Sequence, residues 1–280
     1  MKTLSTLKKD LEFNKGLSSL IEALKTIAVA QYRILEQKLR TFEKLILTIE
    51  NFFDLVDIKT AVSPFLTAAD KPRAVVAITS DSGLLGGLNM QVINGALSEL
   101  GKNPGTLIVI GERGKAYARD SGVPFVAFPG IKDEERFGQA MQLRDYVHGK
   151  VMDGAFGPVS VVYPRPVTFT VQKVENLRFL PFTPAVKKAA PGAHGEEIAF
   201  ESSLKDIAEY LIFLWMGQKF YELFGLSRLA EFAARFVHLE DSHQRLKEMD
   251  SKTRLDYFRV RHEIIDRNMR ELFAARLAFG

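Results

Sequence analysis

Apolar residues in the first 58 positions recur with a seven-residue period. One position of the repeat is held by Ile21, Ala28, Leu35, Phe42, Ile49 and Val56. The companion position is held by Leu17, Leu24, Leu45 and Phe52, with Gln31 and Lys38 as interruptions. This spacing is typical of a coiled-coil helix, whose apolar stripe stays turned toward a partner. Because one helix cannot bury such a stripe alone, the pattern predicts a long N-terminal helix that pairs with another helix.

Residues 204–280 show the same helical character, and only Gly217 and Gly225 weaken it. The predicted apolar seam runs through Leu229, Phe232, Phe236, Leu239, Leu246, Met249, Val260, Ile264 and Phe273, and it is interrupted by His243, Thr253 and Arg267 or Asn268. At about 1.5 Å per residue, a continuous helix of this extent would reach on the order of 110 Å, several times the diameter of a globular domain. The pattern therefore predicts a C-terminal helix that protrudes.

Between the helical regions, short apolar runs alternate with helical patterns. Buried parallel strands are predicted over 74–80, 106–111 and 124–128, a longer paired edge over 159–182, and helices over about 88–101, 113–121 and 134–153. Such alternation is typical of an open, doubly wound sheet with helices on both faces. All 11 prolines lie between Pro64 and Pro191, so both chain ends are free of helix breakers.

Together these patterns predict an α/β fold in three segments. The segments are an N-terminal coiled-coil helix over 1–58, a central α/β domain over 70–185, and a C-terminal coiled-coil helix over 204–280. The most economical arrangement pairs the two terminal helices as an antiparallel coiled coil, with a Rossmann-like, doubly wound α/β domain inserted between them.

Composition narrows the function classes. The chain has 38 basic and 34 acidic residues, and this slight excess is too small to argue for nucleic-acid binding, so we expect none. The absence of cysteine excludes disulfides and thiolate zinc sites, and it fits a reducing compartment such as the cytoplasm. Residues 1–13 interleave charges with leucines and do not form a secretory signal. The apolar run 210–217 falls far short of the roughly 20 residues that span a bilayer. We therefore expect no membrane insertion of its own.

The stretch AITSDSGLLGGLNM, residues 77–90, joins a strand to a helix through a glycine-rich turn. It lacks the G-x-x-x-x-G-K-[ST] pattern of a phosphate-binding loop and the G-x-G-x-x-G pattern of a dinucleotide site. The stretch GERGKA, residues 111–116, places alanine where a hydroxyl residue is needed. We expect a structural corner built on Asp81, Gly83, Gly86 and Gly87, with Asp81 capping the turn or the segment 84–89.

Catalytic chemistry has no candidate in the sequence. His238 and His243 are five residues apart, so they do not form the i, i+4 pair of a helical metal site. No serine lies in a nucleophile elbow, and there is no cysteine nucleophile. We expect no catalytic residues, no metal site and no cofactor. The mixed charges of residues 252–276 form either a solvated helical face or a surface whose arginines meet acidic residues on a protein collar.

Three stretches resemble one family. ITSDSGLLGGLN, residues 78–89, is similar to I-T-S-D-R-G-L-C-G-G-L-N, with Ser82 and Leu85 at the substituted positions. LIEALKTIAVAQYRILEQ, residues 20–37, is similar to I-T-K-A-M-E-M-V-A-A-S-K-M-R-R-A-Q, and AEFAARFVHLEDS, residues 230–242, resembles S-E-x-A-A-R-M-x-A-M-x-x-A. The family is that of the gamma subunits, the central rotor stalks of F-type ATP synthases.

This resemblance implies a mechanical function. The paired helices would form a shaft inside the hexamer of alpha and beta subunits, and the α/β domain would stand beside the epsilon subunit and the c-ring. Rotation would couple proton or sodium flow to ATP synthesis or hydrolysis. The subunit itself would catalyse nothing and would bind no cofactor. Its expected location is cytoplasmic, at the inner face of the membrane through the complex.

The resemblance also implies contact residues for the beta subunit. Arg261 matches the family motif R-Q-A-x-I-T-x-E-L, whereas His262, Asp266 and Asn268 occupy its other positions with different side chains. Leu24 is the apolar position expected to contact the beta subunit from the N-terminal helix.

For the epsilon subunit and the c-ring, the resemblance implies Phe200 and Glu201, in the stretch 198–203. Glu22 stands where the family has lysine. Such charge changes leave open a second, specialised F-type ATPase with co-adapted partners.

Two alternatives of other classes remain at the level of sequence. A nucleotide-binding α/β enzyme could use the long helices as a dimerisation arm, and its isolated chain would bind ATP or NAD. A free-standing coiled-coil scaffold would not co-purify with alpha and beta subunits.

Overall fold

The computed structural model describes residues 2–55, 63–67, 70–101, 105–183 and 202–279, with side chains for all of these except 40–55, 278 and 279. The described chain divides into two compact units. The first, called the tip unit here, contains residues 1–29 and 236–280, and the second, the body unit, contains residues 30–235. The predicted boundaries at 1–58, 70–185 and 204–280 remain a prediction, because the two units cut across both terminal helices.

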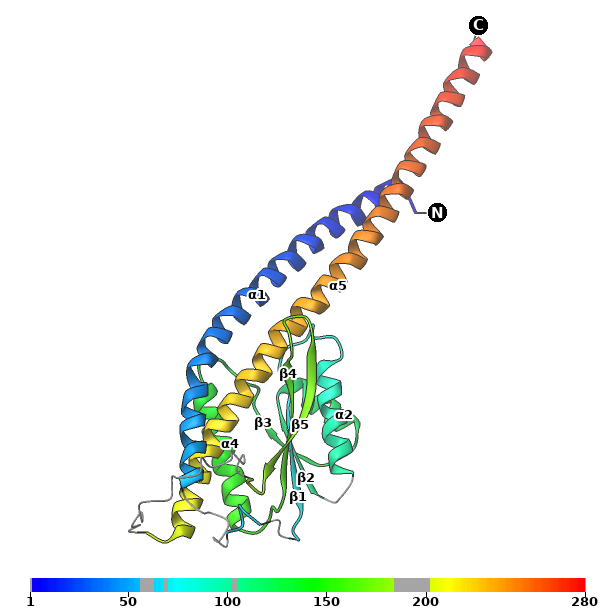
Figure 1. The fold of residues 1–280 in the computed structure, drawn as a ribbon. Coiled ribbons are helices and arrows are strands. Elements are labelled where there is room, and N and C mark those ends of the chain that lie inside the picture. The colour runs from blue at the N-terminus through cyan, green and yellow to red at the C-terminus, as the bar shows by residue number, and fades with distance from the viewer. Residues whose placement is uncertain (1, 56–62, 68–69, 102–104, 184–201, 280) are drawn as a thin grey trace. The chain divides into compact units, whose positions relative to one another are not determined.

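The two predicted terminal helices are present. Helix α1 covers Leu4–Leu55 and helix α5 covers Leu204–Phe279, each without a break (Figure 1). Gly217 and Gly225 lie within α5 and do not end it. A chain cut into separate short helices would need stop signals such as proline, and α5 contains none.

The body unit contains a five-stranded sheet in the order β3-β2-β1-β4-β5. The strands are β1 (Arg73–Ile78), β2 (Gly105–Ile110), β3 (Phe125–Phe128), β4 (Val159–Pro166) and β5 (Gln172–Leu180). The first four run parallel, and β5 pairs antiparallel with β4. The doubly wound sheet is thus confirmed. One detail was wrong: β3 is an edge strand with partly exposed residues and is not buried, because only β2 flanks it.

Helices cover both faces of this sheet (Figure 1). Helices α2 (Leu88–Leu100) and α3 (Glu112–Asp120) contribute to the cluster on one face. Helix α4 (Arg136–Met152) and the body-unit part of α5 share the larger cluster on the other face. The α5 side chains in that cluster are Ala208, Ile212, Trp215, Met216, Phe220, Leu223 and Phe224. The first third of α5 is therefore part of the core of the α/β domain.

Within the tip unit, α1 and α5 pack against each other through an apolar seam. Ile21 of α1 lies in one cluster with Leu239 and Leu246 of α5, and Leu17 and Leu24 pack against it. The helices are antiparallel, since Ser18 bonds His243 while the later Lys25 pairs with the earlier Glu240. In the body unit the same two helices pack separately, through Leu35, Leu229 and Phe232. These clusters confirm the predicted antiparallel coiled coil where side chains are described; the predicted seam residues Phe42, Leu45, Ile49, Phe52 and Val56 lie outside that part of the chain.

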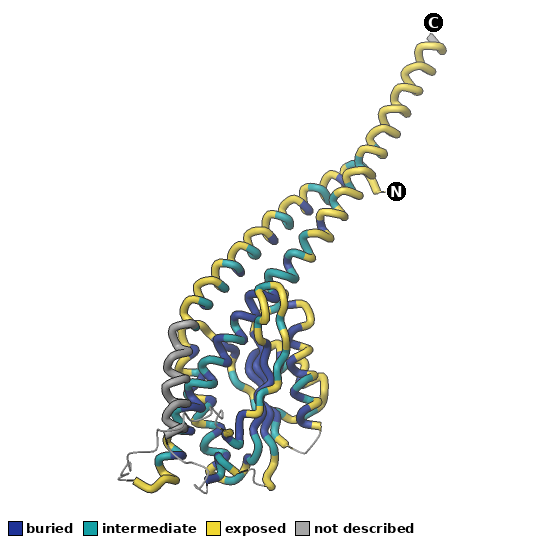
Figure 2. Tube along the Cα trace, viewed as in Figure 1, coloured by how far each residue is buried: buried dark blue, intermediate teal, exposed yellow. Residues whose placement is uncertain are grey.

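The seam does not continue to the end of α5. Residues 261–277 are all exposed (Figure 2). Met249, Ile264 and Phe273, predicted as seam residues, are 60%, 37% and 59% exposed. That part of the prediction was wrong for the single chain. For Ile264 and Phe273 the reason is length: α1 begins 14 residues before Ser18, and 14 residues after His243 lies Tyr257, so α5 extends past its partner. Met249 lies within the paired stretch, on a face of α5 that α1 does not cover.

No helix in the described part of the chain is long and apolar enough to cross a membrane.

Candidate functional site

The glycine-rich stretch forms a closed corner after β1. The backbone N–H of Ser80 donates to Asn89 Oδ1 at 3.1 Å, and Asn89 Nδ2 donates to Ser80 Oγ at 2.9 Å. These bonds join the two ends of the turn, and the backbone between them passes through φ values of 63° at Leu84 and 59° at Gly86. Glycine suits the second of these because a left-handed φ costs it nothing.

The other two predicted glycines serve the same corner. Gly83 lies under the guanidinium of Arg113, which a Cβ would approach to 3.1 Å. Gly87 immediately precedes α2. Leu85 and Leu88 of the corner pack with Ala234 of α5. The glycine-rich loop is therefore seated on α5 within the body unit through Leu85 and Leu88, whereas Leu84 is 51% exposed.

Asp81 caps a helix other than the predicted one. Its Oδ1 accepts a hydrogen bond of 2.8 Å from the backbone N–H of Glu112, the first residue of α3. Helix N-termini are ready anion sites, and here a carboxylate of the chain itself occupies that position. Gly130 lies against the same carboxylate, where a Cβ would come within 2.1 Å of Oδ1. The Gly-Glu-Arg-Gly-Lys stretch thus begins α3, and the carboxylate of Asp81 already occupies the N-terminus of this helix, where a phosphate could otherwise bind.

Open α/β sheets bind ligands in the crevice at their topological switch point. In this sheet that point lies between β1 and β4, because β1 pairs with both β2 and β4. The crevice is filled by Ser227, Arg228 and Glu231 of α5, and the cavity left among these residues and the strand ends has a volume of only about 10 Å³. A nucleotide needs a cavity of hundreds of Å³.

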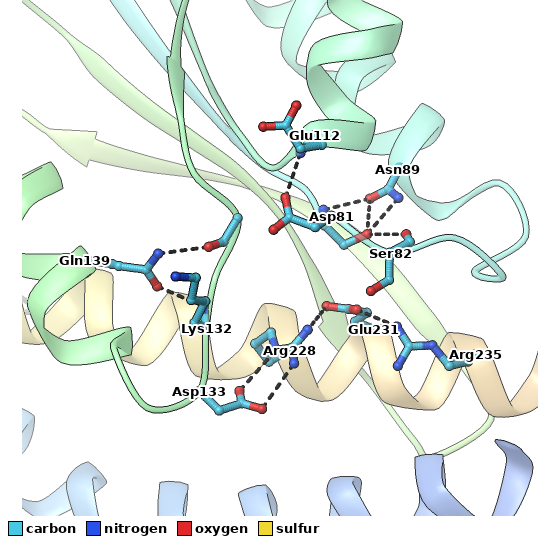
Figure 3. A network of polar contacts seen from close by, with 12 residues as sticks. Asp81, Ser82, Asn89, Glu112, Lys132, Asp133, Gln139, Arg228, Glu231 and Arg235 are labelled. Carbon is cyan, nitrogen blue, oxygen red and sulfur yellow. Dashed lines mark hydrogen bonds and ion pairs between the residues drawn. The ribbon is translucent and has the colours of Figure 1, made fainter.

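A polar network holds α5 in this crevice (Figure 3). Arg228 donates Nε and Nη2 to the two carboxylate oxygens of Asp133, both at 3.1 Å, and Nη1 to Glu231. Glu231 is 4% exposed and also accepts from Arg235 Nη2 at 2.6 Å. Burial acts to lower the pKa of Arg228, but hydrogen bonding to Asp133 and the charge of Glu231 raise that pKa overall. The guanidinium is thus a fixed cation between two carboxylates.

This arrangement is unsuited to nucleotide chemistry. The buried carboxylate of Glu231 lines the switch-point crevice, and it would repel a phosphate brought beside it in this poorly solvated site. Among the described residues, no group of three His, Cys, Asp or Glu side chains could hold a metal ion. His243 instead bonds Ser18 at 3.1 Å and lies 3.8 Å from Glu22.

The sequence-predicted contact residues have two different environments. Arg261, His262, Asp266 and Asn268 all lie exposed on the unpaired end of α5. Leu24 is partly buried and packs against the apolar seam of the tip unit. Phe200 and Glu201 lie outside the described residues.

Sequence reasoning missed a second apolar stripe on α1. Phe13, Leu20 and Ile27 are 69%, 56% and 51% exposed and are spaced by seven residues. Between these large side chains lie two exposed residues with small or no side chains, Gly16 and Ala23. The seven-residue spacing of these three residues could have been read from the sequence. It was overlooked because the buried repeat of Ile21, Ala28 and Leu35 on the same helix is longer. A partner that follows this stripe must run along the helix.

On α5 of the tip unit, a basic series has the same seven-residue spacing. Arg245, Lys252 and Arg259 are all exposed, and the two arginines pair with Asp241 and Asp256 of their own helix. Such exposed pairs are weak and exchange readily for other partners.

Comparison with known proteins gives consistent matches. A family model described as ATP synthase matches residues 3–278. The ATP synthase gamma chain of Symbiobacterium thermophilum is 30% identical over 203 residues, covering 71% of this chain and 69% of that one. The gamma chain of Desulforudis audaxviator is 28% identical, covering 77% and 78%. That of Pelotomaculum thermopropionicum is 24% identical, covering 99% of both chains.

Solved structures show the same fold. A chain of the mitochondrial ATP synthase of Euglena gracilis, from a cryo-EM structure of OSCP, F1 and c-ring in rotational state 3, has a TM-score of 0.71 and 17% identity. It covers 99% of this chain and 94% of that one. A chain of the rotor of the same synthase has a TM-score of 0.65 and 19% identity, covering 94% and 98%.

Proposed function

This chain belongs to the ATP synthase family, among the gamma chains, and we infer from this that it is the central rotor shaft of an F-type ATP synthase. It couples rotation of the c-ring to ATP synthesis or hydrolysis in the alpha/beta hexamer, as a non-catalytic subunit of the complex. The complex is associated with the membrane, and this chain is a peripheral part of it.

The observation that carries this function is the exposed end of α5. Residues 261–277 form a helix without burial, yet they include Ile264, Ile265, Met269 and Phe273, which are between 37% and 59% exposed. Exposed apolar residues at this density mark a surface for a partner. A ring of subunits closed around the helix would cover apolar residues on all its sides.

The second apolar stripe of α1 supports the same partner. Phe13, Leu20 and Ile27 offer apolar contacts, and Arg245, Lys252 and Arg259 of α5 offer positive charge. We assign these surfaces, with Arg261, His262, Asp266, Asn268 and Leu24, to the alpha and beta subunits. Contacts of modest strength suit a shaft that must turn within its collar.

Other parts of the proposal rest on the family resemblance alone. We assign the epsilon subunit and the c-ring to the α/β domain, with Phe200 and Glu201 as contact residues. The inner, cytoplasmic face of the membrane is the proposed location. A specialised F-type ATPase with its own co-adapted partners remains the alternative setting, motivated by Glu22 and by the substituted positions around Arg261.

The nucleotide-binding enzyme is disfavoured by two features of the body unit. Asp81 occupies the anion position of α3, and α5 fills the switch-point crevice. An isolated chain that bound ATP or NAD would revive this alternative, and calorimetric titration of the purified chain would detect it. We expect no binding.

Purification of a tagged chain from native membranes tests the function directly. We expect alpha, beta and epsilon subunits to be recovered with it, in a complex that hydrolyses ATP and pumps ions. A chain truncated after Val260 is the matched control, because it retains the seam of the tip unit but lacks the exposed end of α5. Recovery of the full chain without alpha and beta subunits would contradict the rotor function.

A further inference from the structure

The contact between Arg228 and Asp133 differs from the other contacts of α5 in the body unit. From Ala208 to Phe224 the helix is held mainly by apolar side chains, together with single hydrogen bonds from Arg136 to Tyr221 and from Ser63 to Glu209. Apolar packing is strong but not directional, since it depends on area removed from water. At Arg228 the helix is held by a two-pronged pair, with both N···O distances 3.1 Å, and such pairs fix orientation as well as distance.

Asp133 lies in the loop between β3 and α4, and this loop is itself anchored. Gln139 of α4 accepts from the backbone N–H of Lys132 at 2.9 Å and donates to the carbonyl of Gly130 at 2.8 Å. The loop is thus tied to α4 by Gln139 and to α5 by Arg228 (Figure 3). Through these bonds α5 is connected to α4 and to the loop that follows the edge strand β3.

Glu231 keeps the arginine in place. The Arg228 side chain is 16% exposed and that of Glu231 is 5% exposed, so neither has many alternative rotamers or much water to compete for its bonds. Arg235 satisfies the second oxygen of Glu231. Asp133 can be removed without leaving an isolated buried charge, because its own side chain is 45% exposed and Arg228 then keeps Glu231.

We propose that the Arg228–Asp133 pair, supported by Glu231, is a torque-bearing joint that prevents α5 from rolling against the α/β domain. These are positioning residues, and the inference rests on the proposed rotor function. In a shaft driven through its α/β domain, apolar packing resists separation of α5 from the sheet, and the joint resists rotation of α5 about its own axis. A loosened joint would let the domain turn without carrying the shaft the full step.

The test uses the assembled complex in sealed vesicles and measures ATP-driven ion uptake per ATP hydrolysed. Asp133→Ala should lower this ratio, because the two-pronged pair that fixes the orientation of α5 is lost. Asp133→Glu should restore most of it. The matched control is Asp250→Ala, which removes an Asp–Arg pair within α5 alone. The control should leave the ratio unchanged.

A covalent cross-link distinguishes loss of the Arg228–Asp133 contact from a general loss of protein stability. Since the chain has no cysteine, Asp133→Cys with Arg228→Cys places a unique pair, and a short bismaleimide can connect them. Without the cross-linker, the double-cysteine variant should show a low ratio of ion uptake to ATP hydrolysis. After cross-linking, this ratio should recover. If cross-linking leaves coupling low, or if Asp133→Ala pumps as well as the unaltered chain, the joint is overturned. If the unaltered chain supports no coupled pumping, the rotor function itself fails.

Discussion

His148 lies between two aromatic rings in the body unit. It stacks on Phe65 at 5.0 Å and meets the edge of Phe213 at 5.0 Å. Burial lowers the pKa of His148, and the charge of Glu209 opposes this only in part. The neutral ring is therefore the form that the folded chain prefers.

The lowered pKa predicts a pH dependence of stability. The unfolded chain takes up the proton near the ordinary pKa of about 6.5, before the folded chain does. The free energy of unfolding should therefore be highest above this value and should fall as the pH drops from it toward the lower, folded pKa. Urea unfolding at a series of pH values measures this. His148→Phe keeps the stack on Phe65 and should flatten the slope; an unchanged slope would refute the assignment to His148.

At the scale of single residues, the sequence predicted backbone conformation better than it predicted which side chains form hydrogen bonds with each other. The turn at Gly86 follows from a local requirement for positive φ. The partner of Asp81 does not, because Glu112 comes beside it only when β1 and β2 pair in parallel. Arg228 had no sequence signal at all, since its partner Asp133 is 95 residues away.

At the scale of the helix α5, burial alternates over a few residues. Leu246 is 7% exposed and packs with Ile21 and Leu239, whereas Met249 is 60% exposed. Leu246→Ala should lower the free energy of unfolding of the tip unit by about 2–4 kcal/mol. Met249→Ala is the control and should change it by less than about 0.5 kcal/mol. Hydrogen exchange of the amides of residues 17–28 reports on this unit specifically. Equal protection in both variants would show that the seam is assigned wrongly.

Periodicity predicted the helices and strands well where their apolar residues are buried by other parts of the same chain. The strands β1 and β2 were recognisable as continuous apolar runs because the sheet is covered on both sides. The end of the seam was not recognisable, because apolar residues at Ile264 and Phe273 keep the repeat going past the end of α1. Sequence pattern cannot distinguish a surface buried by its own chain from one that another chain buries.

At the scale of the whole chain, the exposed end of α5 separates folding from assembly. Removing residues 261–280 takes away side chains that are exposed over 261–277, so the thermal unfolding midpoint of the isolated chain should stay within about 2 °C. The affinity for alpha and beta subunits should fall, and co-sedimentation with the hexamer measures it. A large drop in the midpoint would show that this end packs on its own chain.

The fold class followed from the long uninterrupted repeats and the alternating strands and helices, and the rotor function followed from the resemblance of three stretches to the gamma subunits, because all of these are local features of the sequence. The crevice filled by Arg228 and Glu231 was not foreseen, since it needs the sheet order and the path of α5 together.

That filled crevice has a consequence for how the chain can change over time. In an enzyme of similar architecture, substitutions at this edge are selected by turnover. In a rotor shaft, selection acts on stiffness, so side chains at this edge can change in chemical reactivity as long as the contact between Arg228 and Asp133 stays rigid.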